Sequence, residues 1–176
     1  MTQNAPNDSV AATQSRIHVC KSGRRYLFLD DDILTFLARG DETGGRLTVL
    51  DRLGRKNGRA PLVHVHNHHD EAFYVLDGVM GFRLGDHQLM APAGTFVFLP
   101  RGASHDEAVL SDTARALVFV TPGGLEDYFK ELGEPLATAA FPVQAARPPD
   151  FDRLADVGAR YGTEFLPHWS GRRSRA

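Results

Sequence analysis

The sequence predicts an all-β fold, built as an antiparallel sandwich or barrel. Between Arg24 and Pro122 the 176-residue chain runs through short apolar or alternating segments at intervals of about ten residues. Gly, Asp, Asn and Pro stand between these segments, where the backbone must reverse or adopt positive φ. No long segment with helical periodicity separates them, which argues against alternating helices and parallel strands. The expected strands are residues 25–29, 33–38, 46–53, 62–66, 71–77, 79–84, 87–91, 95–100, 105–110 and 115–120.

Two short helices are expected after Pro122. Four apolar residues recur there at i, i+3, i+4 and i+7, before Gly133 and Pro135 end the pattern. They are Leu125, Tyr128, Phe129 and Leu132. A second helix is expected within residues 148–162, which open with paired prolines and an acidic first turn. Its apolar face would carry Phe151, Leu154 and Ala155, with Gly158 next along that face.

These observations divide the chain into four parts. We expect a flexible N-terminal segment (1–20), a barrel (21–123), a helical extension (124–165) and a basic tail (166–176). The Pro- and Ala-rich stretch between the two helices is expected to be an extended connector. The proportion of hydrophobic residues, 42%, is enough for one sizeable core in a chain of this length, so we expect a single domain.

The composition argues against several classes of partner. The formal net charge is only −2, and no patch interleaves Lys or Arg with aromatic residues, so nucleic acid is not expected. No apolar run reaches the roughly 18 residues of a membrane span, and the N-terminus lacks the features of a secretory signal. We therefore expect a cytoplasmic protein that does not bind membranes. The single cysteine, Cys20, has no partner for an internal disulfide or a Cys-type zinc site.

The stretch HVHNHHDEAFYVLDG, residues 64–78, is the strongest functional signal. His64 and His66 are two residues apart in an expected strand, so their imidazoles leave the same face and can bind one first-row metal ion. Glu71 would face inward as well if the polar loop before it bends, and an inward carboxylate needs a metal or hydrogen bonds. His105 follows an apolar run and a Pro-Gly turn that would return it to the interior.

Other polar groups and two aromatic residues receive weaker predictions. His68 and His69 could replace a ligand or donate protons, but their place beside Asp70 in a loop favours solvation. We expect the acidic residues 30–32 and the carboxylates of Asp106 and Glu107 to be solvated as well. Phe73 and Phe98 are predicted to line a substrate pocket over the metal, although apolar residues of a barrel also serve as core.

The pattern resembles the two motifs of the cupin superfamily. The fixed positions of the first motif are matched by Gly58, His64, His66, Glu71 and Gly78. Those of the second motif are matched by Gly94, Pro100, Gly102 and His105. Val109 departs from the second motif, which usually has Asn at this position; in the family that position supports structure rather than metal. The C-terminal part is also similar to small one-domain bacterial relatives of quercetin (flavonol) dioxygenase.

The resemblance implies a double-stranded β-helix, the cupin jelly-roll barrel, with short C-terminal helices. It also implies one divalent transition metal (Fe, Mn, Ni, Co, Cu or Zn) held by His64, His66, Glu71 and His105. The implied activity is that of a dioxygenase, with dioxygen and a small aromatic or enolic substrate, flavonol-like or polyketide-like. Glu71 would be both ligand and general base. A homodimer is implied by family likeness.

Two other functions remain open at this point. The same ligands would serve a non-oxidative isomerase, cyclase or lyase, in which the cation polarises a carbonyl group. A small-molecule-binding barrel without catalysis is the third reading. The sequence leaves the native metal and the substrate undecided, because this ligand set accepts several ions.

Overall fold

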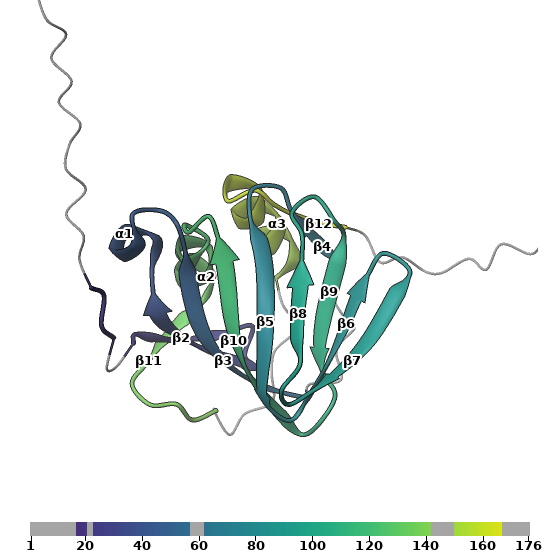
Figure 1. Ribbon diagram of the computed structural model, residues 1–176. Coiled ribbons are helices and arrows are strands. Elements are labelled where there is room, and N and C mark those ends of the chain that lie inside the picture. The colour runs from purple at the N-terminus through teal and green to yellow at the C-terminus, as the bar shows by residue number, and fades with distance from the viewer. Residues whose placement is uncertain (1–16, 21–22, 57–61, 142–149, 167–176) are drawn as a thin grey trace, which may run out of the picture.

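The structure, a computed structural model, describes residues 17–20, 23–56, 62–141 and 150–166, and it consists mainly of two antiparallel sheets (Figure 1). The larger sheet has the strand order β11-β1-β2-β3-β10-β5-β8. Its strands are β11 (Glu134–Leu136), β1 (Arg25–Phe28), β2 (Asp32–Ala38), β3 (Thr48–Arg55), β10 (Thr113–Thr121), β5 (Asp70–Asp77) and β8 (Phe96–Leu99).

The smaller sheet has the order β12-β4-β9-β6-β7. Its strands are β12 (Thr163–Phe165), β4 (His64–His66), β9 (His105–Val109), β6 (Val79–Leu84) and β7 (His87–Pro92). The helices of the described chain are α1 (Gly40–Thr43), α2 (Glu126–Leu132) and α3 (Phe151–Arg160). Each expected strand is present, so the all-β jelly-roll prediction is confirmed.

Alternation of side chains builds the core between the two sheets. In β5, Phe73 and Val75 are buried while Tyr74 and Leu76 are exposed, as expected for a strand with one face inward. The larger sheet contributes residues such as Leu50 to the same core that receives Met80 from the smaller one. Gly78 has a φ of 73° at the turn between β5 and β6, where a Cβ atom would lie 2.3 Å from the carbonyl oxygen of Thr113. The turn therefore requires glycine.

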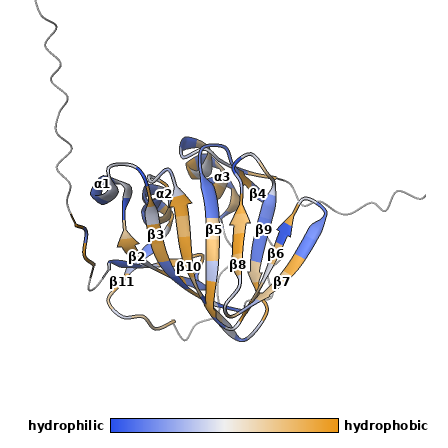
Figure 2. Ribbon diagram, in the orientation of Figure 1, coloured by the Kyte–Doolittle hydropathy of each residue, from blue (hydrophilic) through white to orange (hydrophobic). Residues whose placement is uncertain are grey.

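Hydropathy varies along the strands that surround the site (Figure 2). β8 and β10 are mostly hydrophobic, whereas β5 and β9 both begin with hydrophilic residues. Because β5 belongs to the larger sheet and β9 to the smaller one, polar groups from both sheets meet near one end of the core.

The C-terminal part adds to both sheets. β11 pairs with β1, and β12 pairs with β4. The stretch expected to be only an extended connector thus begins with a strand, and its residues 142–149 lie outside the described part of the chain. The expected segments 1–20 and 166–176 also lie almost entirely outside it, as does Gly58. The boundaries of the four predicted parts remain a prediction.

Helix α3 forms where it was expected, but only Leu154 and Gly158 of the predicted face are buried, and Phe151 and Ala155 are exposed. Phe151 is 54% exposed, while Leu154, Val157 and Gly158 are buried. A Cβ atom on Gly158 would lie 2.8 Å from the carbonyl oxygen of Thr163, so the missing side chain lets α3 lie close to β12. The helix therefore buries the side that carries Leu154, Val157 and Gly158, and Phe151 lies outside. Among the described residues, no helix has the length and apolar character needed to cross a membrane.

Candidate metal centre

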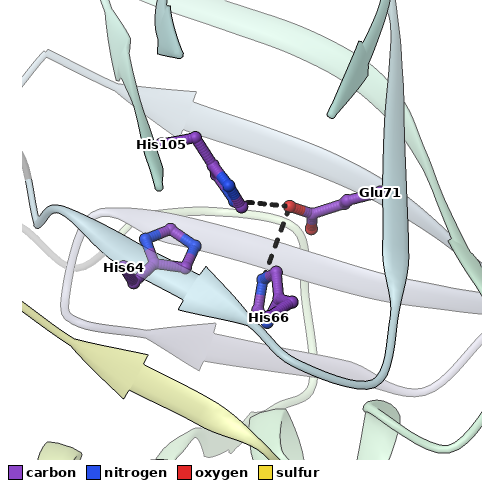
Figure 3. Close-up of side chains that lie close together, drawn as sticks. All are labelled: His64, His66, Glu71 and His105. Carbon is purple, nitrogen blue, oxygen red and sulfur yellow. Dashed lines mark ion pairs between the residues drawn. The ribbon is translucent and has the colours of Figure 1, made fainter. Parts of the chain in front are cut away.

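Four side chains converge between the two sheets (Figure 3). His64 and His66 extend from the same face of β4, and His64 lies directly opposite His105 of β9. Glu71 comes from the second position of β5, in the other sheet. The potential ligand atoms of these four residues all lie within 4.8 Å of one another. The cluster therefore joins the two sheets at one point.

The loop between β4 and β5 turns Glu71 inward. Its backbone is held by a hydrogen bond from the Asn67 amide to the Gly162 carbonyl (2.7 Å). His69 is buried, with Nδ1 2.8 Å from the carbonyl oxygen of Pro122. Asp70 accepts hydrogen bonds from the Arg101 side chain and backbone amide. The loop bends as predicted, but His69 is a buried anchor of the loop rather than a solvated residue; His68 is exposed.

Hydrogen bonds orient the three imidazoles. Nδ1 of His64 lies 2.7 Å from the Leu62 carbonyl, and Nδ1 of His105 lies 2.9 Å from the Ala103 carbonyl. Nδ1 of His66 lies 3.0 Å from Thr163 Oγ1. With Nδ1 engaged in this way, each ring has Nε2 free as a donor to metal, the arrangement commonly found around metal-bound histidines.

The distances from Glu71 to two of the imidazoles fit one bound ion. Glu71 Oε2 lies 3.6 Å from His66 Nε2 and 3.7 Å from His105 Nε2, beyond hydrogen-bonding distance (Figure 3). Two ligands of one ion at about 2.1 Å each can be at most about 4.2 Å apart, so these separations match. His105 Nε2 is buried and has no hydrogen-bond partner among the described residues. Since such atoms are normally satisfied, the donor set can hold a divalent first-row metal ion.

The protonation states of Glu71 and His64 suit metal ligation. Burial works to raise the pKa of Glu71, but the imidazoles of His105 and His66 outweigh it and hold the pKa of that carboxyl below its usual range. Burial lowers the pKa of His64. Near neutral pH the carboxyl group is therefore ionised and the His64 imidazole is neutral, the forms that bind metal.

A cavity of about 300 Å³ opens beside the cluster. His64, His66 and Glu71 line it, while His105 lies behind them against a separate cavity of about 280 Å³. Much of the larger cavity is apolar: Phe28, Leu29, Leu62, Phe129 and Phe165 contribute to its walls. Its volume is at the lower end of the range for small-molecule sites, and its lining is of the type such sites have. Val109 also lines the larger cavity. It is the last residue of β9 and pairs with Met80 of β6.

The structure places neither Phe73 nor Phe98 in the wall of this cavity. Phe73 is 1% exposed and packs against Phe82 in the core, with the ring centroids 5.0 Å apart. Phe98 is 52% exposed, because β8 turns Val97 and Leu99 inward instead. All four residues of this strand are apolar, so alternation of hydropathy could not indicate which pair faces the core.

The carboxylates that were expected to be solvated are also placed differently. Asp106 is buried and paired with Arg83, and Glu107 accepts a hydrogen bond from Arg52 (3.2 Å). Asp32 is buried and receives both Nε and Nη2 of the same arginine at 2.9 Å. Asp31 is buried as well. The arginine partners lie on other strands, 20 or more residues away in sequence, so the local pattern around the acids could not reveal them.

Two residues of the site were not anticipated from the sequence. Thr163 orients His66, and nothing in its spacing from the histidines signals this because it reaches them only through the pairing of β12 with β4. Tyr128 lines the cavity, although the sequence indicated only that it belongs to the apolar face of a helix. Both come from the segment that follows the barrel strands.

Comparison with known proteins agrees with this geometry. Residues 55–121 match the protein family described as "Cupin domain", and this range includes all four residues of the cluster. That part of the chain is similar to a cupin domain. The predicted resemblance to cupins is therefore confirmed, and the resemblance to quercetin dioxygenase is confirmed by a curated relative.

The chain has a curated relative and several structural neighbours. Over 144 residues it is 28% identical to quercetin 2,3-dioxygenase of Bacillus subtilis (strain 168), an alignment that covers 82% of this chain but 42% of the relative. A structure of a Streptomyces PAC13 variant with uridine superimposes with a TM-score of 0.52 at 14% identity, covering 69% of this chain and 91% of that one. KdgF from Halomonas sp. gives 0.48 at 15% identity, covering 55% and 85%. The chain thus spans less than half the length of the curated relative, and the PAC13 likeness is one of fold.

Proposed function

We propose that this protein is a metal-dependent dioxygenase that acts on a small aromatic or enolic substrate, flavonol-like or polyketide-like. The observation that carries the proposal is the cluster of three imidazoles and one carboxylate, of which His64, His66 and Glu71 face a cavity with both apolar and charged walls. The similarity to quercetin 2,3-dioxygenase supports the choice of reaction. Aromatic and charged side chains both line this cavity, which suits a flat ring that carries polar groups.

The residues of the site would have three roles: metal binding, proton acceptance and exclusion of water. His64, His66, Glu71 and His105 would hold the ion, which supplies Lewis-acid polarisation and an open position for an oxygen atom of the substrate. Glu71 lines the cavity as well, so its carboxylate can accept the proton of a substrate hydroxyl group. The apolar walls exclude water and so protect the resulting enolate from reprotonation.

The test is oxygen uptake by protein loaded separately with Fe, Mn, Co or Ni and incubated with flavonols in air. We expect at least one form to consume oxygen with the flavonol, and Glu71→Gln to lose turnover by orders of magnitude at equal protein concentration. Uptake with none of the four metals would refute the flavonol form of the proposal. Product formed under strict anaerobiosis would instead assign a non-oxidative isomerase, cyclase or lyase. Tight binding without turnover, unaffected by Glu71→Gln, would assign a binding protein.

A further inference from the structure

The turn between β1 and β2 has a backbone conformation that its residue types disfavour. Leu29 and Asp30 are its two central residues, and the Asp31 amide closes the turn by donating to the Phe28 carbonyl (3.3 Å). The φ angles of Leu29 and Asp30 are 52° and 62°; among the described residues, every other residue with positive φ is glycine. Hairpin turns of this kind favour Asn-Gly or Asp-Gly. A bulky aliphatic side chain is disfavoured there because its Cβ atom crowds the backbone, so Leu29 carries strain that glycine would not have.

Leu29 lines the cavity beside the metal cluster, whereas Asp30 does not. The side chain of Leu29 is half-buried and packs against the core. The carbonyl oxygen of Asp30 accepts a hydrogen bond from Arg55 Nη2 (2.8 Å), and the carbonyl oxygen of Asp31 accepts one from the Arg55 amide (3.0 Å). These bonds tie the turn to the end of β3. The side chain of Leu29 is therefore held in the cavity wall by a turn that is fixed at both of its strands.

The turn lies at the end of the cavity that is remote from the metal cluster. Asp32, the first residue after the turn, pairs with Gly54 of β3. A Cβ atom on Gly54 would lie 2.7 Å from Cγ2 of Val109, so this end of the larger sheet packs against the end of β9. Val109 is four residues beyond His105 on β9, which is about 13 Å at the usual rise of a strand. Leu29 and the metal cluster thus lie at opposite ends of one cavity.

The strain at Leu29 calls for an explanation, because a glycine would make the same turn without it. Strained backbone persists where the surrounding structure imposes it, and it is concentrated at functional positions. What leucine adds at this position is a branched side chain in the end wall of the cavity. A substrate with an oxygen atom on the ion extends along the cavity toward this wall. The side chain of Leu29 then decides how long that substrate can be.

We propose that Leu29 is a specificity-determining residue, which limits the length of the substrate between the metal cluster and the β1–β2 turn. The substrate class is then an aromatic or enolic molecule whose metal-binding oxygen lies no more than about 13 Å from its far end. This inference rests on the proposed function in one respect, because it assumes that the substrate binds the metal through oxygen. It deepens that proposal by assigning the exclusion of longer molecules to a residue that is not a metal ligand.

Two rigid hydroxamates of different length test the limit without turnover. Benzohydroxamate and biphenyl-4-hydroxamate have the same metal-binding group, but the second is longer by one phenyl ring. Calorimetry on the zinc-loaded protein gives the affinity for each, and zinc has no redox chemistry. We expect the wild type to bind benzohydroxamate more tightly. In Leu29→Ala and Leu29→Gly the affinity for the biphenyl probe, relative to benzohydroxamate, should rise about tenfold or more, because an overpacked contact is removed.

The matched control is Asp30→Gly. This substitution replaces the other residue with positive φ in the same turn but removes no side chain from the cavity wall. The preference for benzohydroxamate should therefore equal that of the wild type. Zinc content, measured for every variant, should also equal that of the wild type, because neither residue belongs to the metal cluster.

Urea unfolding of the zinc-loaded variants measures the strain. Alanine and glycine both remove the leucine side chain, but only alanine keeps a Cβ atom at positive φ. At an ordinary position glycine would be the less stable of the two, because it loses more chain entropy on folding. At position 29 we expect the reverse, with the unfolding equilibrium constant of Leu29→Gly about three- to fivefold lower than that of Leu29→Ala.

Each outcome decides the proposal. A wild type that binds the biphenyl probe at least as tightly as benzohydroxamate, or binds neither, overturns it, as does a Leu29→Ala variant with the wild-type preference. Leu29→Gly less stable than Leu29→Ala also overturns it, because the turn would then not strain Leu29. Oxygen uptake with flavonols is scored separately. A preference that depends on Leu29 without uptake supports this inference and refutes the dioxygenase, whereas uptake without such a preference does the reverse.

Discussion

Glu126→Gln is expected to destabilise the fold by about 2–4 kcal/mol near neutral pH. Glu126 is 4% exposed, at the beginning of α2. Its Oε1 accepts from the Gly40 amide (2.7 Å), and its Oε2 accepts from the Thr48 hydroxyl (2.5 Å) and the Gly124 amide (2.8 Å). Glutamine has one acceptor oxygen, so at least one of these donors would face an NH₂ group. An unsatisfied buried donor costs about 1–3 kcal/mol, and the loss of charge-assisted bonds adds to this.

The effect of this substitution should depend on pH. Burial works to raise the pKa of Glu126, but hydrogen bonds, that from Thr48 foremost, outweigh it and lower the pKa below its usual value. A carboxyl group with a lowered pKa in the folded state stabilises the protein above its unfolded pKa of about 4.3, and this contribution is lost as the pH falls through the folded pKa. The difference between the wild type and Glu126→Gln should therefore be full above about pH 5 and shrink below about pH 4.

Urea unfolding followed by circular dichroism, repeated across this pH range, measures the difference in the free energy of unfolding. Glu131→Gln is the control, since Glu131 lies on the same helix and binds Arg160 and Tyr161 at the surface. Such exposed pairs contribute about 0–1 kcal/mol, so the control should unfold almost like the wild type. Equal stability of Glu126→Gln and the wild type at neutral pH, or a difference that persists undiminished at about pH 3, would contradict the reasoning.

Three further predictions concern the metal centre and the core. His66→Ala should lose bound metal, which elemental analysis measures. Its circular dichroism spectrum should stay that of a β protein, because the apolar core does not depend on the ligands. An unfolded apoprotein would show instead that the metal is structural. Thr163→Val removes the partner of His66 Nδ1 and should weaken metal binding roughly 10- to 100-fold, measured by chelator competition. Phe73→Ala should lower the free energy of unfolding by about 3–5 kcal/mol, whereas Phe98→Ala should change it by about 0.5 kcal/mol or less. Urea unfolding measures both variants. Equal effects would contradict the buried position of Phe73 and the exposed position of Phe98.

The strand pattern and the metal cluster were predictable because they depend on short-range geometry. Side chains two residues apart in a strand share a face, so His64 and His66 had to point the same way. The motif spacing then indicated Glu71 and His105, which the structure places beside them. The helix at 124–133 was equally clear from its period, and α2 occupies it.

The failures share one cause, which is that the deciding partner is distant in sequence. From the sequence, Glu107 was expected to be a solvated turn residue. In the structure it accepts a hydrogen bond from Arg52 of β3, which is 55 residues away in sequence. Phe98 lies in a strand that is apolar on both faces, and only the packing of Val97 and Leu99 on the core selects the buried face.

The sequence by itself determined the all-β class, the resemblance to cupins and the four side chains of the candidate metal centre, because period and motif spacing are local properties of the chain. Only the tertiary structure decided what surrounds them. It brings Glu71 of one sheet against three histidines of the other, seats Thr163 behind His66 and turns Tyr128 into the cavity. These contacts depend on strand pairing and helix docking across long loops, where the gain comes from burying surface and satisfying polar groups rather than from any local preference.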